Sequence, residues 1–323
     1  MELSIIFVNW NSFGHLRESL RAVFATAPKV EYEVIVVDNA SSADDVMKVR
    51  AEFSHVKLIT SEKNLGFAGA NNLGMKYSRG QYLLFLNPDT IVAGNAIALM
   101  LQAMKAVGGA GIMGCRLQNT DGSVQTSCIQ RFPTIWNQLL DVEFLRLRRP
   151  HWKLWGIAPL FSQCTEPVVV EVVSGACLLI DRDSFLQAGG FSREYFMYAE
   201  DVDLCYQIRK LGRKAYYTGN ASVLHHGGGT SREQCGNAWV AIMQRQAILK
   251  FCRRTRGPAY AETFRVAMAG NALLRLVVLA IVLPFRKQAT DKRFLHSTPA
   301  KWFGVLKWAL GLDRRISRLH GGV

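Results

Sequence analysis

Apolar residues in the first hundred positions come in short continuous runs, and each run stops at polar residues. The runs lie within residues 3–11, 32–42, 55–60 and 82–90. Runs of this length, bounded by turn-forming residues, are typical of strands buried on both faces. Helical spacing of apolar residues is found over 15–25, 44–53 and 96–107. This alternation of strands and helices predicts βαβ units, a mostly parallel sheet and therefore an α/β fold.

Polar residues follow each predicted strand at the end where the chain leaves it. The carboxyl ends of parallel strands meet at one edge of a sheet, which is where open α/β sheets bind ligands. We therefore expect one crevice lined by Asn9, Asn11, Asp38, Asn64, Gly66, Asn87 and Asp89. For Asp89 two interpretations stand side by side. The tripeptide Asn-Pro-Asp forms turns for purely local reasons, or the carboxylate holds a metal ion or a polar cofactor.

Two nucleotide-binding classes are excluded because their phosphate-binding motifs are missing. The first turn, residues 9–14, lacks the G-x-G-x-x-G pattern of dehydrogenases, and no P-loop pattern occurs in the chain. Asp38 could still accept hydrogen bonds from a base or a ribose. The amides around Gly66 and Asn71 either face such a donor or simply cap the helix expected to begin there.

The middle of the chain carries two groups of candidate chemical residues. Glu200 and Asp201 open a predicted helix, where acidic residues also suit the helix dipole. Carboxylates close to one another and to aromatic rings have raised proton affinity, as a general base requires. His225 and His226 end a predicted strand before a glycine run, which favours a metal or phosphate role over a purely structural one.

The segments between these motifs give less definite predictions of structure. Residues 109–127 read as a strand, a turn at Asp121 and Gly122, and a returning strand. Residues 131–165 are irregular and rich in Trp, Pro and Arg, which suits either a loop over the site or a surface for an apolar partner. Residues 174–176 are the small residues Ser-Gly-Ala, which allow another part of the backbone to approach closely.

Charge divides the chain into two parts. The net charge of the 323 residues is +14, but positions 250–323 hold 15 Lys or Arg against three acidic residues. We expect a nearly neutral domain over 1–250 and a basic membrane-associating region over 251–323. Met1 leads directly into the first strand pattern, so no signal peptide is expected and the body should face the cytoplasm.

These motifs together resemble glycosyltransferase family 2, inverting enzymes with the GT-A fold, and especially its bacterial rhamnosyltransferase-like members. The resemblance covers roughly residues 1–250. The matching stretches are VNWN at 8–11, VVDNAS at 36–41, NLGFAGANN at 64–72, FLNPD at 85–89, SGACLLIDR at 174–182, EDVDLC at 200–205 and HHGGGTS at 225–231.

The resemblance implies roles for the candidate residues. Asp38 would bind the base of a nucleotide sugar beside Val8, Asn9 and Asn11, and Asn64, Gly66, Asn71 and Asn87 would complete the donor site. Asp89 would be the last acid of the family's D-x-D motif and would hold Mg2+ or Mn2+ together with His225. Asp201, next to Glu200, would be the general base. One departure is Asn87, which stands where the motif has a second acid.

The basic tail has membrane-surface character. Residues 266–285 are apolar and nearly long enough to span a bilayer, but Arg275 in the middle favours a helix in the interface. Residues 301–318 predict an amphipathic helix with Trp302 on its apolar side and Lys307 on its basic side. The alternative is a helix packed on the body with a solvated basic face.

The sequence therefore predicts a peripheral enzyme on the cytoplasmic face of the inner membrane. By the resemblance it would move L-rhamnose from dTDP-L-rhamnose to a polyprenyl-diphosphate-linked saccharide. The enzyme itself would be bound to the anionic surface of the inner leaflet. The alternatives are a UDP- or GDP-sugar donor, a nucleotide-sugar-binding pseudoenzyme, and a nucleic-acid-binding protein. No nucleic acid is expected as a partner, because the body is neutral and the tail has an apolar face.

Overall fold

The computed structural model describes residues 1–26, 28–140, 148, 166–227, 237–282 and 299–313. The chain forms two compact units, and each is described separately below. The first comprises Met1–Phe132 and Val142–Thr230, and the second comprises Pro133–Asp141 and Ser231–Val323. The boundary expected at residue 250 would fall within helix α10 (Asn237–Arg256) of the second unit.

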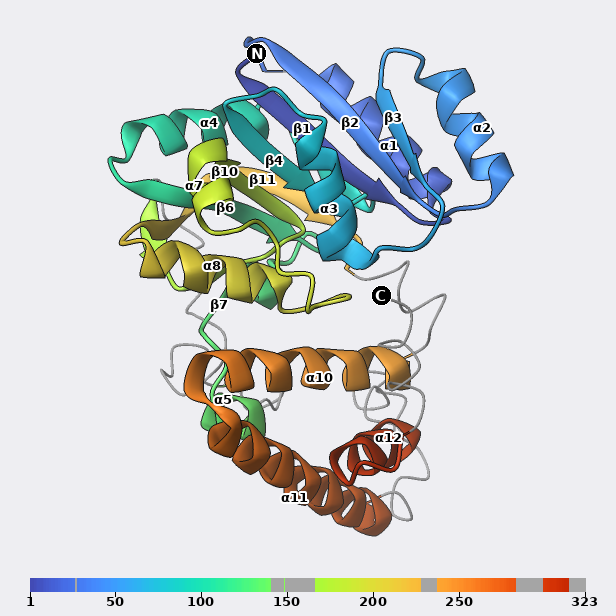
Figure 1. Ribbon diagram of the computed structural model, residues 1–323, viewed down its shortest axis with the longest axis vertical. Coiled ribbons are helices and arrows are strands. Elements are labelled where there is room, and N and C mark those ends of the chain that lie inside the picture. Colours follow the sequence, from blue (N-terminus) through green and yellow to red (C-terminus); the bar gives the residue numbers. More distant parts are fainter. Residues whose placement is uncertain (27, 141–147, 149–165, 228–236, 283–298, 314–323) are drawn as a thin grey trace. The chain divides into compact units, whose positions relative to one another are not determined.

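A large mixed sheet forms the centre of the first unit (Figure 1). Its strands are β1 (Leu3–Asn9), β2 (Tyr32–Asn39), β3 (Lys57–Ser61), β4 (Tyr82–Leu86), β5 (Thr90–Val92), β6 (Ala110–Gln118), β8 (Val168–Val170), β10 (Cys177–Asp181) and β11 (Lys214–His225). They are arranged in the order β3-β2-β1-β4-β10-β6-β11-β5, and β8 pairs with β11. The predicted parallel pairing is confirmed for β1 to β4. Strand β10 is antiparallel to both its neighbours, β4 and β6.

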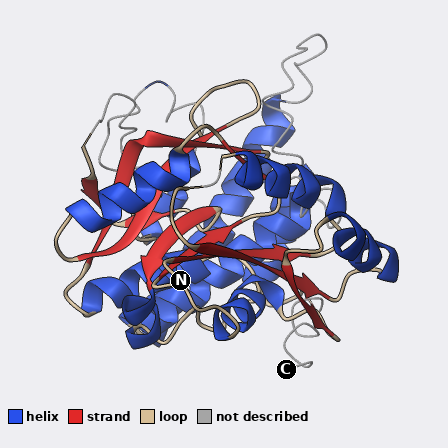
Figure 2. Ribbon diagram, turned by 90° about the horizontal axis from the view of Figure 1, so that it is seen from above, coloured by secondary structure: helices blue, strands red, loops and turns tan. Residues whose placement is uncertain are grey.

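Helices cover both faces of the sheet (Figure 2). They are α1 (Phe13–Ala25), α2 (Ala43–Glu52), α3 (Gly66–Lys76), α4 (Ala96–Ala106), α7 (Arg182–Gln187) and α8 (Glu200–Lys210). Side chains alternate across a strand. Ile5 and Phe7 of β1 therefore belong to one core cluster with Leu16 and Leu20 of α1. Ile6 points to the other face, where α3 comes so close that a Cβ on Gly74 would lie 2.6 Å from it.

The hairpin expected at residues 109–127 is wrong in its second half. The turn is present, since the Gly122 amide donates to the Asn119 carbonyl, but the returning segment makes a single bridge between Gln118 and Val124. A 3-10 helix, Thr126–Cys128, follows. The partners of β6 are instead β10 and β11, two strands that come from later in the chain. A second small sheet joins β7 (Ile129–Gln130) to β9 (Val172–Val173).

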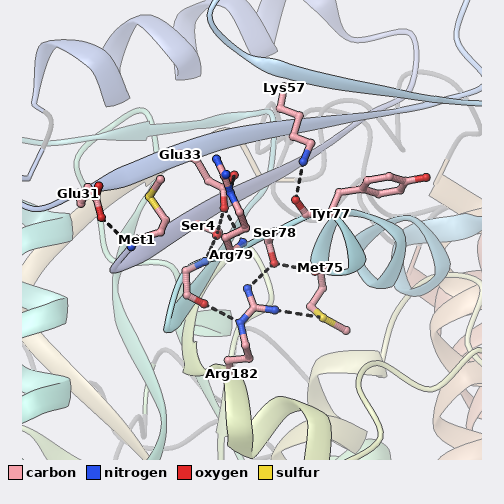
Figure 3. Close-up of polar contacts among 11 residues, drawn as sticks. Met1, Ser4, Glu31, Glu33, Lys57, Met75, Tyr77, Ser78, Arg79 and Arg182 are labelled. Carbon is pink, nitrogen blue, oxygen red and sulfur yellow. Dashed lines mark hydrogen bonds and ion pairs between the residues drawn. The ribbon is translucent and has the colours of Figure 1, made fainter.

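Arg182, at the start of α7, binds the segment that leads from α3 into β4 (Figure 3). Its Nε donates to the Gly80 carbonyl at 2.7 Å and its Nη2 to Ser78 Oγ at 2.7 Å. The Gly80 amide donates to Ser4 Oγ, and a Cβ on Gly80 would lie only 2.4 Å from the Ser4 nitrogen. These contacts lie at the amino ends of β1 and β4, opposite the edge where polar residues follow the strands.

The second unit is helical. It contains α5 (Ile135–Leu139), α10, α11 (Pro258–Val282) and α12 (Pro299–Ala309). A buried cluster joins the last three helices and includes Leu249, Phe264, Met268 and Trp302. Trp308 of α12 donates its Nε1–H to Gln246 Oε1 of α10 at 2.7 Å.

The amphipathic helix predicted over 301–318 is too long. It ends at Ala309, and Gly311 adopts a left-handed conformation with φ +75°; residues 314–318 lie outside the described part. Trp302 and Val305 of α12 pack into the helical core, while Phe303 is exposed. Helix α11 is, within the described residues, the one helix long and apolar enough to cross a membrane.

Candidate active site

The ends of β1 and β2 are joined by a network of polar side chains. Asn9 pairs with Asp38 in register, and its Nδ2 donates to the Asp38 carboxylate at 3.2 Å. The amide of Ser41 donates to the other carboxylate oxygen at 3.1 Å, and Ser41 Oγ in turn accepts from the Asn11 amide. Both Asn9 and Asp38 are buried, and Val8 lies just before them on the strand. The structure thus brings together the four residues predicted to surround a nucleotide base.

Asn39, which the sequence did not single out, links this network to the loop before α3. Its Oδ1 accepts from the Leu65 amide at 2.7 Å, and its Nδ2 donates to Asn64 Oδ1 at 2.9 Å. Asn64 Oδ1 also accepts from the Gly66 amide. Gly66 has φ +70°, and a Cβ there would lie 2.3 Å from the Phe196 carbonyl oxygen. The amide of Gly66 is therefore engaged within the loop, and this glycine allows the loop to approach the segment before α8.

A second polar cluster follows β4. Asp89 is 5% exposed, and its Oδ1 lies 3.4 Å from His225 Nε2 at the end of β11. Asn87 Nδ2 lies 3.4 Å from the same nitrogen, and Asn87 Oδ1 is buried with no hydrogen-bond partner among the described residues. The pairing of β5 with β11 places these residues together, since His225 is opposite Thr90. Asp89 and His225, which the resemblance pairs as metal ligands, therefore lie together, and Asn87 joins them.

Gln125 fixes the hydrogen on Nδ1 of His225. Its Nε2 donates to the His225 carbonyl at 2.6 Å, which turns its Oε1 toward the ring, 2.9 Å from His225 Nδ1. A carbonyl oxygen can only accept, so Nδ1 carries a hydrogen. Nε2 then presents either a lone pair or an additional proton to Asp89. The sequence prediction missed Gln125, because it lies in the segment expected to form a hairpin strand.

This group fits a divalent cation. A lone pair on His225, the Asp89 carboxylate and the unpartnered oxygen of Asn87 are all acceptors of the kind that Mg2+ and Mn2+ use. Burial by itself would raise the pKa of Asp89, but the hydrogen bond and charge of His225 and the charge of His15 outweigh it and lower the pKa. Among the described residues no group of three or more His, Cys, Asp or Glu gathers as a metal site. A cation held by Asp89, His225 and Asn87 would have room in its coordination sphere for further ligands.

At the start of α8, Glu200 is buried and Asp201 is half-buried. Asp201 accepts from the Gly175 amide at 2.8 Å, and a Cβ on Gly175 would lie only 3.3 Å from that of Asp201. Burial raises the pKa of Asp201, although hydrogen bonds from Gly175 and Val202 oppose this. Glu200 is 6% exposed, and its Oε2 finds no hydrogen-bond partner in the part of the chain that the structure describes. Burial together with the charge of Asp201 holds the pKa of Glu200 well above the usual range.

Backbone strain is concentrated just before this pair. Tyr198 and Ala199 have φ values of 69° and 62°, which non-glycine residues seldom adopt and which cost about 1–2 kcal/mol each. Strain of this kind is retained where the surrounding structure enforces it, often at active sites.

Hydrogen bonds connect the acidic pair to the Asp89 group. The residue after Gly175, Ala176, accepts from the Asn87 amide at 3.0 Å through its carbonyl oxygen. This contact exists because β10 is antiparallel to β4, so that β10 begins where β4 ends. Asp201 and Asp89 are therefore held at the same edge of the sheet.

Asn71 is the predicted donor residue that the structure places differently. It is 1% exposed, and its Nδ2 donates to the Phe67 carbonyl within α3. Its neighbour Asn72 makes two hydrogen bonds to the backbone of Phe191, one through each end of its amide. Asn71 thus makes its hydrogen bond within α3, whereas Asn72 links α3 to the Gly-Gly-Phe turn.

The sheet order and the polar edge define an α/β fold with a candidate site at one edge, and comparison with known proteins gives the family. The model of Glycosyl transferase family 2 matches residues 4–185, so the chain belongs to this family and is a glycosyltransferase. An N-acetylglucosaminyl-diphospho-decaprenol L-rhamnosyltransferase of Mycobacterium tuberculosis is 30% identical over 69% of this chain and 76% of its own length. A rhamnosyltransferase of Escherichia coli K12 is 22% identical over 69% of this chain and 82% of its own.

The solved structures agree on the fold. A mannosyltransferase from Pyrobaculum calidifontis, solved with GDP-Man and Mn2+, superposes with a TM-score of 0.57 at 16% identity and covers 96% of this chain and 86% of that one. The predicted GT-A fold is confirmed by this likeness.

Proposed function

We propose that this glycosyltransferase moves L-rhamnose from dTDP-L-rhamnose onto a saccharide carried by a polyprenyl diphosphate, at the cytoplasmic face of the inner membrane. The observation that carries the proposal is the likeness to the mycobacterial relative, whose name specifies both rhamnosyl transfer and an N-acetylglucosaminyl-diphospho-decaprenol acceptor. The rhamnosyltransferase of Escherichia coli supports the same sugar.

In this proposal Asp201 is the general base. Its carboxylate takes the proton from an acceptor hydroxyl while that oxygen forms a bond to the anomeric carbon. The bond from the anomeric carbon to the nucleoside diphosphate breaks on the opposite face, so the configuration is inverted. The raised pKa of Asp201 suits this role, because a base of higher pKa takes the proton more readily.

The remaining residues hold the donor. Asp38, with Asn9 and Asn11 beside it, would accept hydrogen bonds from the base. Asp89, His225 and Asn87 would hold Mg2+ or Mn2+, which when bound offsets the charge that develops on the departing diphosphate.

A panel of nucleotide sugars tests the donor. The thermal midpoint Tm of the full chain would be measured with Mn2+ and dTDP-L-rhamnose, UDP-sugars or GDP-sugars, because a ligand that binds the native state raises Tm. We expect the largest rise with dTDP-L-rhamnose. A larger rise with a UDP- or GDP-sugar would reassign the donor.

The acceptor is tested by product formation. The preferred donor would be incubated with a polyprenyl-diphosphate-linked N-acetylglucosamine and, as a control, with free N-acetylglucosamine. We expect transfer to the lipid-linked saccharide, and equal transfer to both would remove the diphosphate lipid from the proposal.

A further inference from the structure

Two further histidines lie side by side next to the Asp89 group. His15 is in the first turn of α1, and His226 directly follows β11. Their ring centres are 5.4 Å apart. The backbone amide of His226 donates to the Asp89 carbonyl at 3.0 Å, which holds this pair beside the Asp89 group. Neither ring is needed for the cation that Asp89, His225 and Asn87 would hold.

The ring of His226 has a polar atom that makes no hydrogen bond within the described structure. Its Nε2 is buried and finds no partner among the described residues. The preceding histidine, His225, differs, because its ring nitrogens lie 2.9 Å from Gln125 and 3.4 Å from Asp89. A buried polar atom without a partner is unfavourable, and such atoms in native proteins commonly bind water or a ligand. The Nε2 of His226 is therefore available to a molecule from outside the protein.

Helix α1 is attached to both parts of the candidate site. Ser12, just before the helix, donates through Oγ to Asn9 Oδ1 at 2.9 Å, which joins α1 to the polar network around Asp38. One turn after His15, Ser19 Oγ lies 3.4 Å from Thr90 Oγ1, in the strand that follows Asp89. The first turn of α1 is thus held between the two groups of polar residues.

The order of the strands sets the path of a nucleotide across this edge. β1 lies between β2 and β4 (Figure 1). Because neighbouring strands are about 4.8 Å apart, the ends of β2 and β4 are separated by roughly 10 Å. A nucleotide with its base at Asp38 and its diphosphate at Asp89 would cross the end of β1. At that point the chain enters α1, whose first turn carries His15.

The chemistry of the two rings suits a diphosphate. An imidazole N–H is a hydrogen-bond donor, and a hydrogen bond to a charged acceptor is stronger than one between neutral groups. The Asp89 carboxylate by itself would repel the negative charge of a diphosphate. Donors beside that carboxylate would therefore add to what a bound cation contributes.

We propose that His15 and His226 bind the diphosphate of the nucleotide sugar, with the Nε2–H of His226 donating to one of its oxygens. This inference rests on the proposed function, and it assigns a contact with the leaving group to two residues outside the base network and the metal group. The diphosphate stays intact when its bond to the sugar breaks, so the contact is also present with the product. A nucleoside diphosphate is therefore a suitable probe.

Calorimetry of the full chain with dTDP, UDP and GDP in the presence of Mn2+ tests the contact. The nucleotide that the wild type binds most tightly is then used for the variants. His226→Phe keeps an aromatic ring but has no N–H, so Kd should rise by about 10-fold or more, as for the loss of one hydrogen bond to a charged group. His15→Phe should change Kd in the same direction.

A conservative variant and a matched control separate a direct contact from a structural role. His226→Gln supplies an amide N–H close to the position of Nε2 and should recover most of the affinity. His55→Phe is the control, because His55 packs on Phe24 before β3, at the opposite edge of the sheet, and Kd should stay unchanged. Wild-type affinity in His226→Phe, or equal losses in His226→Phe and His226→Gln, would overturn the proposal. Circular dichroism checks that each variant is folded.

The Mn2+ concentration distinguishes a phosphate contact from a metal ligand. Kd is measured with increasing Mn2+ until it no longer changes. We expect the loss in His226→Phe to persist at saturating Mn2+. A loss that disappears there would make His226 a metal ligand and overturn the contact with the diphosphate. If the wild type bound none of the three nucleotides, the proposed function itself would fail. Tight nucleotide binding that is independent of both histidines would refute this inference alone.

Discussion

Gln125 shows how one side chain outside the predicted motifs can set the chemistry of a site. Both ends of its amide bind His225, one through the carbonyl and one through Nδ1. As a result, His225 directs Nε2 toward Asp89. Groups that orient a metal-binding histidine in this way commonly change metal affinity 10–100-fold when they are removed.

We therefore expect Gln125→Ala to weaken Mn2+ binding by about 10–100-fold in the presence of dTDP, measured by calorimetry. The reason is that the His225 ring would lose the acceptor that fixes its tautomer. Gln130→Ala removes an amide from the same segment, one that donates to the Ser127 carbonyl and does not contact His225 among the described contacts. It should leave Mn2+ affinity unchanged. Wild-type affinity in Gln125→Ala would show that Asp89 and His225 need no such support.

Asp201→Asn tests the base. The variant should bind the donor as the wild type does, because the side chain keeps its shape, but transfer should fall by at least about 100-fold. In the wild type, kcat/KM should fall as the pH is lowered through the pKa of Asp201, since only the carboxylate accepts a proton. Burial raises that pKa, so the fall should begin above the usual Asp value of 3.8. Asp203→Asn, on the same helical turn, is the matched control and should retain most of the transfer rate.

Glu200 makes the stability of the fold depend on pH. Its pKa in the folded protein is raised well above 4.5, so the folded state binds the proton more tightly than the unfolded state. The stabilisation is complete below pH 4.5 and is lost as the pH rises through the folded pKa. Glu200→Gln should remove this pH dependence and raise Tm at pH 7 by about 3 °C, as roughly 1 kcal/mol does in a domain of this size. If Glu200→Gln had the same Tm as the wild type at every pH from 4 to 8, burial of the Glu200 carboxylate would not be a cost to stability.

At the scale of elements, the loop before α3 and the segment before α8 support each other. Gly66 touches the Phe196 carbonyl, and the next amide, Phe67, donates to the same oxygen at 2.9 Å. The segment thus held contains Tyr198 and Ala199, whose strained backbone precedes Glu200 and Asp201. A change in α3 is therefore expected to reach the acidic pair.

Gly66→Ala should destabilise the fold more than left-handed strain alone. Gly122, with φ +80° and nothing within 4 Å of an added Cβ, is the matched control. Gly122→Ala should cost about 1–2 kcal/mol in urea unfolding. Gly66→Ala adds a clash with Phe196 and should cost more, with lower kcat. Equal losses of stability in the two variants would mean that the contact with Phe196 relaxes freely.

The sequence predicted the elements that have strong local patterns. It failed where strand pairing or a side-chain contact depends on residues that are distant in the sequence. Strands β1 to β4 and the residues at their ends follow from apolar runs, because parallel strands present the same edge. The segment around Gln125 resembled a hairpin strand, yet β6 takes its partners from residues 177–181 and 214–225. Asn39 stood beside Asp38 without a distinguishing signal, since its importance lies in contacts with residues 64–66.

At the scale of the whole molecule, the exposed aliphatic side chains of α11, which include Leu274 and Val278, predict where the protein is found when a cell is fractionated. The double substitution Leu274→Gln and Val278→Gln should move the protein from the membrane pellet to the soluble fraction, because it removes two large exposed apolar side chains from one face. Met47→Gln, a similarly exposed apolar residue on α2, is the control. Truncation after residue 255 is a poorer test, since it deprives Leu249 and Cys252 of the residues that bury them.

The antiparallel strand β10 also affects how the chain folds during synthesis. β4 pairs through Leu86 with Cys177, a residue that the ribosome adds 91 positions later. At about 5–20 residues per second this interval is roughly 5–18 seconds. Throughout it the apolar strand β4 has an unpaired edge, which is a template for association with other nascent chains. The strand that brings Gly175 to Asp201 thus leaves the young polypeptide with an open strand edge until the candidate site is complete.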